Sequence, residues 1–144
     1  VEDQTRAEER IPDLLATPAA VRWISAEPLL GPVDLTLDGL ACLPCVHCTN
    51  GPIDPETGCC DCPRCDDTGI GTEWGIDWVV AGGESGPNAR PMHPDWARSL
   101  RDQCRAAGVA MFVKQLSSGG SKPIRDIDAF PKGLRIREYP NAKG

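Results

Sequence analysis

A short apolar run that ends in two glycines constrains the fold of this chain more than any other stretch. Residues 78–81 are Trp-Val-Val-Ala, and Gly82, Gly83, Glu84 and Ser85 follow directly. A continuous apolar run that stops at turn residues is typical of a buried parallel strand whose carboxyl end opens into a loop. Ligands bind at that end of the strands in open α/β sheets and in α/β barrels. The stretch predicts a strand with a functional rim, although an ordinary strand exit explains the same residues.

Two further segments show the same order of strand and polar exit. Residues 21–26 are rich in β-branched and aromatic side chains and lead into Glu27. Residues 109–113 form a third apolar run, which leads into Lys114. Each of these two runs thus ends, like the first, in a polar residue at its carboxyl end. A structural ion pair of Lys114 with Glu27 or Glu84 is the simpler interpretation of these charges.

The first helical pattern covers residues 5–16. It places Ile11, Leu14 and Leu15 on one face. Proline in a helix removes a hydrogen bond and clashes with the preceding turn. Pro12 therefore predicts a break near Ile11, with a second helical piece that begins at the proline.

The second helical pattern covers residues 94–107. Pro94 suits a first helical turn, and Gly108 suits the position just after a helix. Trp96, Leu100 and Cys104 recur at a spacing of four, so they form the expected buried face. Cys104 is accordingly interpreted as a small core residue.

Strands that alternate with helices predict parallel βα units and an α/β fold. We expect a small parallel sheet with helices. Residues 1–40 and 75–116 would form this sheet and its helices. Residues 41–74 would be a cysteine-rich insertion of the zinc-ribbon type, and residues 117–144 a basic, mostly irregular tail.

The charge is distributed unevenly over the 144 residues. Residues 1–113 carry 8 Lys/Arg against 18 Asp/Glu, whereas residues 114–144 carry 7 against 3. An acidic body argues against non-specific nucleic-acid binding as the main activity, and the basic tail keeps a nucleic-acid-binding module as an alternative. No apolar run is long enough to span a membrane, and no signal-peptide pattern is present, so no membrane contact and a cytoplasmic location are expected.

Seven of the eight cysteines lie between Cys42 and Cys65. In a chain without a secretion pattern such a cluster indicates metal binding. Cys45 and Cys48 form one C-x-x-C pair, Cys62 and Cys65 form another, and a turn-like sequence around Pro55 lies midway between them. Four thiolates brought together by a hairpin satisfy a closed, structural Zn²⁺ site.

The choice of ligands is open. Cys42 and Cys59 extend the two pairs, and Cys60 adds one more thiol, so a shifted set fits the same spacing. Seven cysteines with His47 would suffice for two metals, and four thiolates also suit an iron–sulfur cluster.

Several stretches together resemble a phage-associated family of radical-SAM-like proteins, known as the three-Cys-motif or gene-product thirty-seven/sixty-eight family. The resemblance covers most of residues 1–34 and 77–116. The matching stretches are Val1-Glu2-Asp3-Gln4, Arg10-Ile11-Pro12, Leu14-Leu15-Ala16-Thr17-Pro18, Ser25-Ala26-Glu27-Pro28-Leu29-Leu30-Gly31-Pro32, Asp77-Trp78-Val79-Val80-Ala81-Gly82-Gly83-Glu84-Ser85-Gly86-Pro87, Ala89-Arg90-Pro91-Met92, Asp95-Trp96, Arg101-Asp102-Gln103-Cys104 and Lys114-Gln115.

The resemblance implies that residues 1–40 and 75–116 form an α/β half-barrel, the C-terminal part of a partial (β/α) barrel. In the family that barrel is expected to hold S-adenosylmethionine and a [4Fe–4S] cluster. The cluster motif of that family, C-x-x-x-C-x-x-C, does not occur in this sequence. Both cofactors are therefore expected only if an N-terminal half that carries the motif is present, and this chain alone is expected not to be an enzyme. By position, the residues that would face the cofactor pocket are Glu2, Ser25, Glu27, Gly82, Gly83, Glu84, Ser85 and Lys114.

The expected function is that of a zinc-binding, phage-type binding or structural module without catalysis of its own. The alternative is the C-terminal portion of a radical-SAM enzyme that is active only with its cluster-binding half. A half-barrel exposes a sheet edge and apolar surface, so a protein partner or self-association is expected to cover them.

Overall fold

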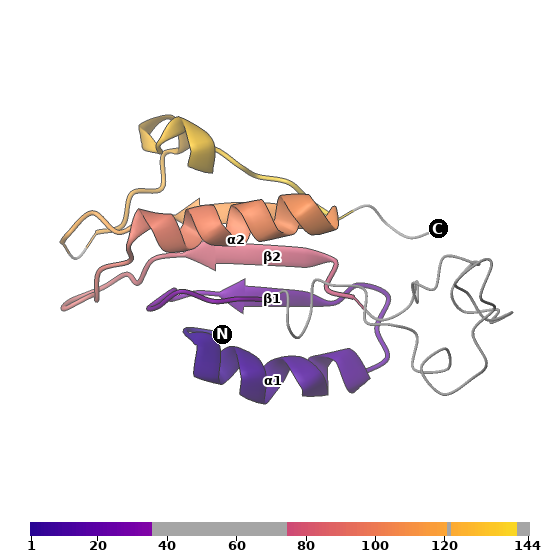
Figure 1. Cartoon of the computed structure of the whole chain (residues 1–144). Coiled ribbons are helices and arrows are strands. Elements are labelled where there is room, and N and C mark those ends of the chain that lie inside the picture. The colour runs from indigo at the N-terminus through magenta and orange to yellow at the C-terminus, as the bar shows by residue number, and fades with distance from the viewer. Residues whose placement is uncertain (36–74, 121, 141–144) are drawn as a thin grey trace, which may run out of the picture.

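The computed structural model describes residues 1–35, 75–120 and 122–140, and the account below concerns these residues. They form a mixed α/β unit with a small parallel sheet (Figure 1). In chain order the elements are α1 (Gln4–Ala16), β1 (Trp23–Ala26), β2 (Trp78–Gly82), α2 (Pro94–Ala107), β3 (Ala110–Gln115) and two 3₁₀ turns, η1 (Ile127–Ala129) and η2 (Lys132–Leu134).

The three strands are all parallel and lie in the order β1-β2-β3. Ala26, Ala81 and Val113 are aligned across the sheet. The register then shifts by one residue, because Gly82 pairs with Gln115 and leaves Lys114 as the extra residue of a bulge. The α/β class and the parallel strands predicted from the sequence are confirmed.

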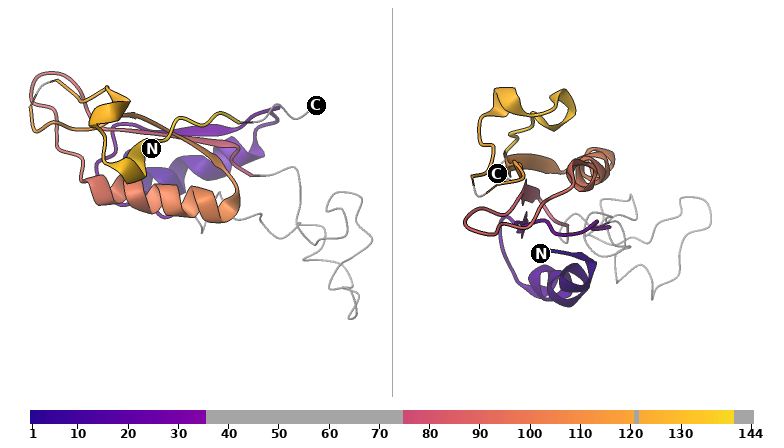
Figure 2. Two further views of the ribbon diagram at one scale, coloured as in Figure 1. Left: turned by 90° about the horizontal axis from the view of Figure 1, so that it is seen from above. Right: turned by 90° about the vertical axis from the view of Figure 1, so that its left-hand side faces the viewer.

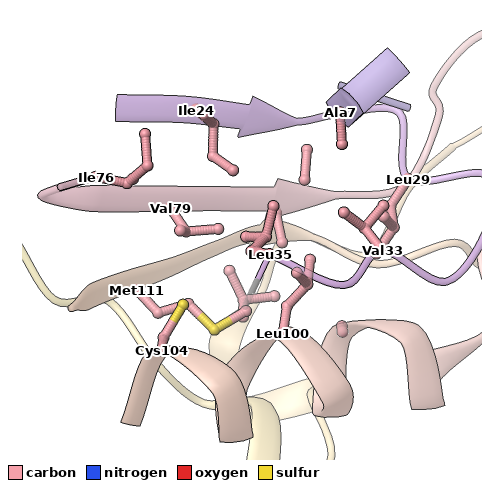
Figure 3. Close-up of a cluster of buried hydrophobic side chains, with 14 of the residues drawn as sticks. Ala7, Ile24, Leu29, Val33, Leu35, Ile76, Val79, Leu100, Cys104 and Met111 are labelled. Atoms are coloured by element: carbon pink, nitrogen blue, oxygen red, sulfur yellow. The ribbon is translucent and has the colours of Figure 1, made fainter. Parts of the chain in front are cut away.

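Both helices contribute to one apolar core on the same side of the sheet. Figure 2 shows α2 across β2 and β3, with α1 on the same side near β1. Figure 3 shows the core between the sheet and the helices. Its buried members include Ala7, Ile11, Leu15, Ile24, Leu29, Val79, Ala81, Leu100, Cys104, Met111 and Val113. Among the described residues, no helix combines the length and apolarity needed to cross a membrane.

Helix α1 runs without interruption through Pro12, so the predicted break near Ile11 was wrong. Asp3 caps the helix, because its carboxylate accepts a hydrogen bond from the backbone N–H of Arg6 at 3.0 Å. Pro12 costs the helix one hydrogen bond. Burial of Ala7 and Ile11 before the proline, and of Leu15 after it, holds the two parts against the same core and keeps them in line.

Helix α2 begins at Pro94 and ends at Ala107, as the sequence predicts. Gly108 follows it with a φ of 67°, a left-handed conformation that glycine adopts without strain. Leu100 and Cys104 are buried, whereas Trp96 is only partly buried against the core. Burial raises the pKa of the Cys104 thiol to about 12, so this cysteine is an unreactive core residue.

The chain after β3 folds back along the outer edge of that strand. The N–H of Val113 donates to the carbonyl of Ile136 at 2.9 Å, and the N–H of Glu138 donates to the carbonyl of Met111 at 2.9 Å. Phe130 and Leu134 join the core. The segment therefore covers the β3 edge, whereas within the described residues β1 is paired along its length only with β2.

Candidate functional site: the helix-free face of the sheet

The sheet face opposite the helices changes from aromatic to charged along the strands. Because side chains alternate between the two faces of a strand, every second residue from Trp23, Trp78 and Ala110 onward belongs to this face. We call it the helix-free face. Its successive rows are Trp23–Trp78–Ala110, Ser25–Val80–Phe112 and Glu27–Gly82–Lys114, of which the last includes the register shift.

The charged row is an ion pair that crosses the central strand. The Nζ of Lys114 donates to Oε2 of Glu27 at 3.0 Å. The backbones of β1 and β3 are about 10 Å apart, because each lies about 4.8 Å from β2. The pair forms over Gly82, where a Cβ would lie 3.2 Å from Cδ of Glu27. A larger residue at position 82 would thus stand between the two charges.

Lys114 and Glu27 differ in their access to solvent. The Lys114 side chain keeps 53% of its accessible surface and the Glu27 side chain keeps 18%. The ammonium group therefore sits at the rim and the carboxylate lies deeper, against the glycine. Of the two partners considered for Lys114, Glu27 and Glu84, the structure pairs it with Glu27, which places opposite charges at the carboxyl ends of two strands.

A second set of contacts, all hydrogen bonds, joins the loop after β2 to the end of β3. The Gln115 side chain is buried and donates through Nε2 to the carbonyl of Gly83 at 2.7 Å, and the N–H of Gly83 donates to the Gln115 carbonyl at 3.1 Å. Nε of Arg125 donates to Oε1 of Gln115 at 3.1 Å. A Cβ on Gly83 would lie only 2.6 Å from Oγ of Ser117, so this position requires glycine.

Glu84 is bound within its own loop. Its carboxylate accepts hydrogen bonds from Nε and Nη2 of Arg90 at 3.0 and 2.6 Å, and from the Arg90 backbone N–H at 2.6 Å. Hydrogen bonds from the Arg90 side chain, followed by the one from its backbone, lower the pKa of Glu84 to about 2. Ser85 is exposed in the same loop. The structure thus brings Glu27, Gly82 and Lys114 together, while Glu84 acts as an anchor for residues 84–90.

Ser25 and Glu2 lie at the outer side of β1. The backbone carbonyl of Ser25 accepts a hydrogen bond from the Val1 amino group at 2.6 Å. The carboxylate of Glu2 pairs with Nη1 of Arg10 at 3.2 Å. The Ser25 side chain belongs to the helix-free face by register with Val80, whereas Glu2 is engaged by helix α1.

The aromatic end of the helix-free face is a packed cluster of rings. Ring centroids are 5.6 Å apart for Trp23–Trp78, 6.1 Å for Trp78–Phe112, and 5.6 Å for both Trp78–Tyr139 and Phe112–Tyr139. The guanidinium of Arg137 lies over the Phe112 ring, 5.5 Å from its centroid. Nε1 of Trp78 donates to the carbonyl of Glu138 at 2.9 Å, which fixes the last segment against the sheet.

The sequence did not single out Gln115, Arg125, Arg137 or Tyr139 for this face. The only signal for the rings is that the apolar runs of the strands are continuous. Such runs predict apolar side chains on both faces of the sheet but do not predict what contacts the second face. Arg125, Arg137 and Tyr139 come from the segment that was expected to be an irregular tail.

The predicted zinc ligands Cys45, Cys48, Cys62 and Cys65 lie outside the described residues, as do the alternatives Cys42, Cys59 and Cys60. Within residues 1–35, 75–120 and 122–140, no three His, Cys, Asp or Glu side chains are grouped so that they could hold a metal ion. The zinc site stays a prediction from the sequence.

The fold and the charged row define an α/β protein whose parallel strands end in a polar edge. Comparison with protein families identifies it further. The family model described as "Protein of unknown function (DUF5131)" matches residues 1–134, and the chain belongs to that family. Neither the curated proteins nor the solved structures contain a match to this chain.

Proposed function

We propose that this chain is a ligand-binding module whose binding site is the charged end of the helix-free face. The observation that carries the proposal is the Glu27–Lys114 ion pair over Gly82. Opposite charges at the carboxyl ends of two parallel strands that flank β2, next to glycines that admit a close approach, match the usual position of ligand sites in α/β proteins. A small zwitterionic ligand suits the pair, because its ammonium complements Glu27 and its carboxylate complements Lys114.

The proposed architecture is the wall of a partial (β/α) barrel of the radical-SAM-like, phage-associated type. Parallel strands with both helices on one side support it, because the other side is then free to form the interior of a barrel. S-adenosylmethionine and a [4Fe–4S] cluster belong to this proposal only together with a segment that carries C-x-x-x-C-x-x-C. This chain alone is proposed to bind without catalysing. The second candidate is the C-terminal portion of a radical-SAM enzyme, which an in-frame cluster motif in the gene would favour.

The binding proposal can be tested with methionine, a small zwitterionic probe. ¹⁵N-labelled protein titrated with methionine should show saturable amide shifts at Glu27, Gly82 and Lys114. The Lys114→Gln variant should abolish them, because it removes the charge that complements the ligand carboxylate. Arg98→Gln serves as the control, since Arg98 lies on α2 and pairs with Asp95. Shifts that spare the three residues, or that survive in Lys114→Gln, would overturn the proposal.

A structural zinc site in residues 41–74 is proposed on the two C-x-x-C pairs. Protein purified without added metal should contain about one equivalent of Zn²⁺. Chelation should unfold that segment and leave the α2 amides unchanged. A content below about half an equivalent of zinc, in the absence of iron, would contradict the site.

Self-association or a protein partner is proposed to cover the β1 edge. Within the described residues β1 pairs in the sheet only with β2, and open strand edges recruit further strands. Sedimentation should detect an assembly larger than one chain. A monodisperse monomer at high concentration would count against self-association.

A further inference from the structure

Exposed apolar side chains gather at one end of the helix-free face. Among the described residues, the large hydrophobic side chains with high exposure are Val21, Trp23 and Tyr139, which keep 37%, 47% and 67% of their accessible surface. Trp23 and Tyr139 both contact Trp78, and Val21 lies two residues before the start of β1. Exposed apolar patches of this kind mark binding surfaces more often than isolated exposed residues do.

The rings form a platform rather than a cage. Their centroids are 5.6–6.1 Å apart, so they are in contact with one another and do not surround a space for a cation. The face of Phe112 is already covered by Arg137. What remains accessible is the exposed part of Trp23 and Tyr139, a geometry that suits stacking by one planar group.

The positive charge beside the platform, that of Arg137, is not neutralised by a carboxylate. Among the described residues, Arg125 and Arg137 form no ion pair, whereas Arg6, Arg10, Arg90, Arg98 and Arg101 each pair with an acidic side chain. Nη2 of Arg137 donates to the Arg125 carbonyl at 2.9 Å, and Nε of Arg125 donates to Gln115. The Arg137 guanidinium is thus held at the β3 side of the rings, with further N–H groups to offer an anion, whereas that of Arg125 lies at the carboxyl end of β3.

We propose that the aromatic end of the helix-free face binds a mononucleotide. The base stacks on Trp23 and Tyr139, and the phosphate is bound by Arg137. A planar ring joined to an anion complements both features at once, which an apolar peptide or an uncharged ring does not. The acidic charge of the whole chain, −6, favours a free nucleotide over a polynucleotide, whose many phosphates it would repel. The site does not use Glu27 or Lys114 and is independent of the zwitterion site.

Isothermal titration with adenosine 5′-monophosphate tests the proposal, with adenosine and inorganic phosphate as the two partial ligands. Adenosine monophosphate should bind saturably and more tightly than either part. Trp23→Ala and Tyr139→Ala should each weaken it about tenfold, because stacking on an aromatic ring is lost. Arg137→Gln should remove the preference for the monophosphate over adenosine and leave adenosine binding unchanged.

Two matched controls lie on the helix side. Arg98→Gln removes an exposed arginine that is far from the platform in the fold, and Trp96→Phe alters a tryptophan of α2; neither should change the affinity. The proposal is overturned if the monophosphate gives no saturable binding, if adenosine binds equally well, or if Arg98→Gln weakens binding as much as Arg137→Gln. A single-stranded oligonucleotide that binds over a hundredfold more tightly would reassign the face to nucleic acid. If the nucleotide does not bind but methionine still shifts the amide signals of Glu27 and Lys114, the mononucleotide site is overturned and the proposed ligand-binding function is not.

Discussion

The same three strands form both faces of the sheet, but the two faces have different roles. On the helix-covered face, Ile24, Val79 and Met111 alternate with residues of the other face and are buried against α1 and α2. On the helix-free face, exposed rings give way to an ion pair. The difference teaches that stability is concentrated on the covered face. The free face can therefore carry polar and exposed groups, which a core would not tolerate unless they were paired.

The strongest test of this contrast is a cavity on the covered face. Leu100 is fully buried in the core. Leu100→Ala should lower the free energy of unfolding by about 2–5 kcal/mol, because it removes buried methyl groups and leaves a cavity. Urea unfolding followed by circular dichroism measures the loss. Leu100→Met is the control and should cost less than about 1.5 kcal/mol; a loss below that figure for Leu100→Ala would contradict the assignment of the core.

The next effect is expected at the loop where the strands end. Gly83→Ala should destabilise the protein by about 1–3 kcal/mol, because the new Cβ meets both Oγ and the backbone nitrogen of Ser117. Gly82→Ala is the matched control, since its nearest neighbour is the end of the flexible Glu27 side chain. The same urea titration should therefore find Gly83→Ala the less stable of the two. Equal stabilities would mean that the Gly83–Ser117 contact is not formed in solution.

A smaller effect is expected on the free face. Trp23→Ala should cost about 1 kcal/mol, the order of one aromatic pair, because Trp23 is half-exposed and makes a tilted ring contact with Trp78. Urea unfolding compares it directly with Leu100→Ala. A loss as large as that of Leu100→Ala would show that the rings are a second core and not a binding surface.

The smallest effect on stability near neutral pH is expected at the Glu84–Arg90 loop, where the readout is a pKa. The carboxyl of Glu84 should titrate at about 2 by NMR, and Arg90→Gln should move the midpoint toward the ordinary value of 4.5. Because the folded pKa is lowered, the stabilisation from ionised Glu84 is fully present above 4.5 and is lost as the pH falls through about 2. An unchanged titration midpoint in Arg90→Gln would rule out the hydrogen bonds between Arg90 and Glu84.

Local patterns predicted the elements well, because they depend on neighbours in sequence. Helix α2 was predicted with its ends, since Pro94 and Gly108 mark a start and a stop whatever surrounds them. Pro12 was misjudged for the opposite reason. Its local cost is real, but burial of Ile11 and Leu15 against the core outweighs it, and that packing is not visible in a helical pattern.

The sequence by itself determined three parallel strands that end near Glu27, Gly82 and Lys114, because strand ends and turns are encoded by residues that are close together in the sequence. Only the tertiary structure decided how those strand ends pair. Glu27 and Lys114 are 87 positions apart and meet because β2 lies between their strands with a glycine at the crossing. Glu84, equally acidic in sequence, is bound by Arg90 six positions away. The register shift after Ala81 brings Gln115 opposite Gly82, and the return of the chain along β3 brings Tyr139 against Phe112. Both contacts depend on the packing of the whole sheet, so the local sequence does not predict them.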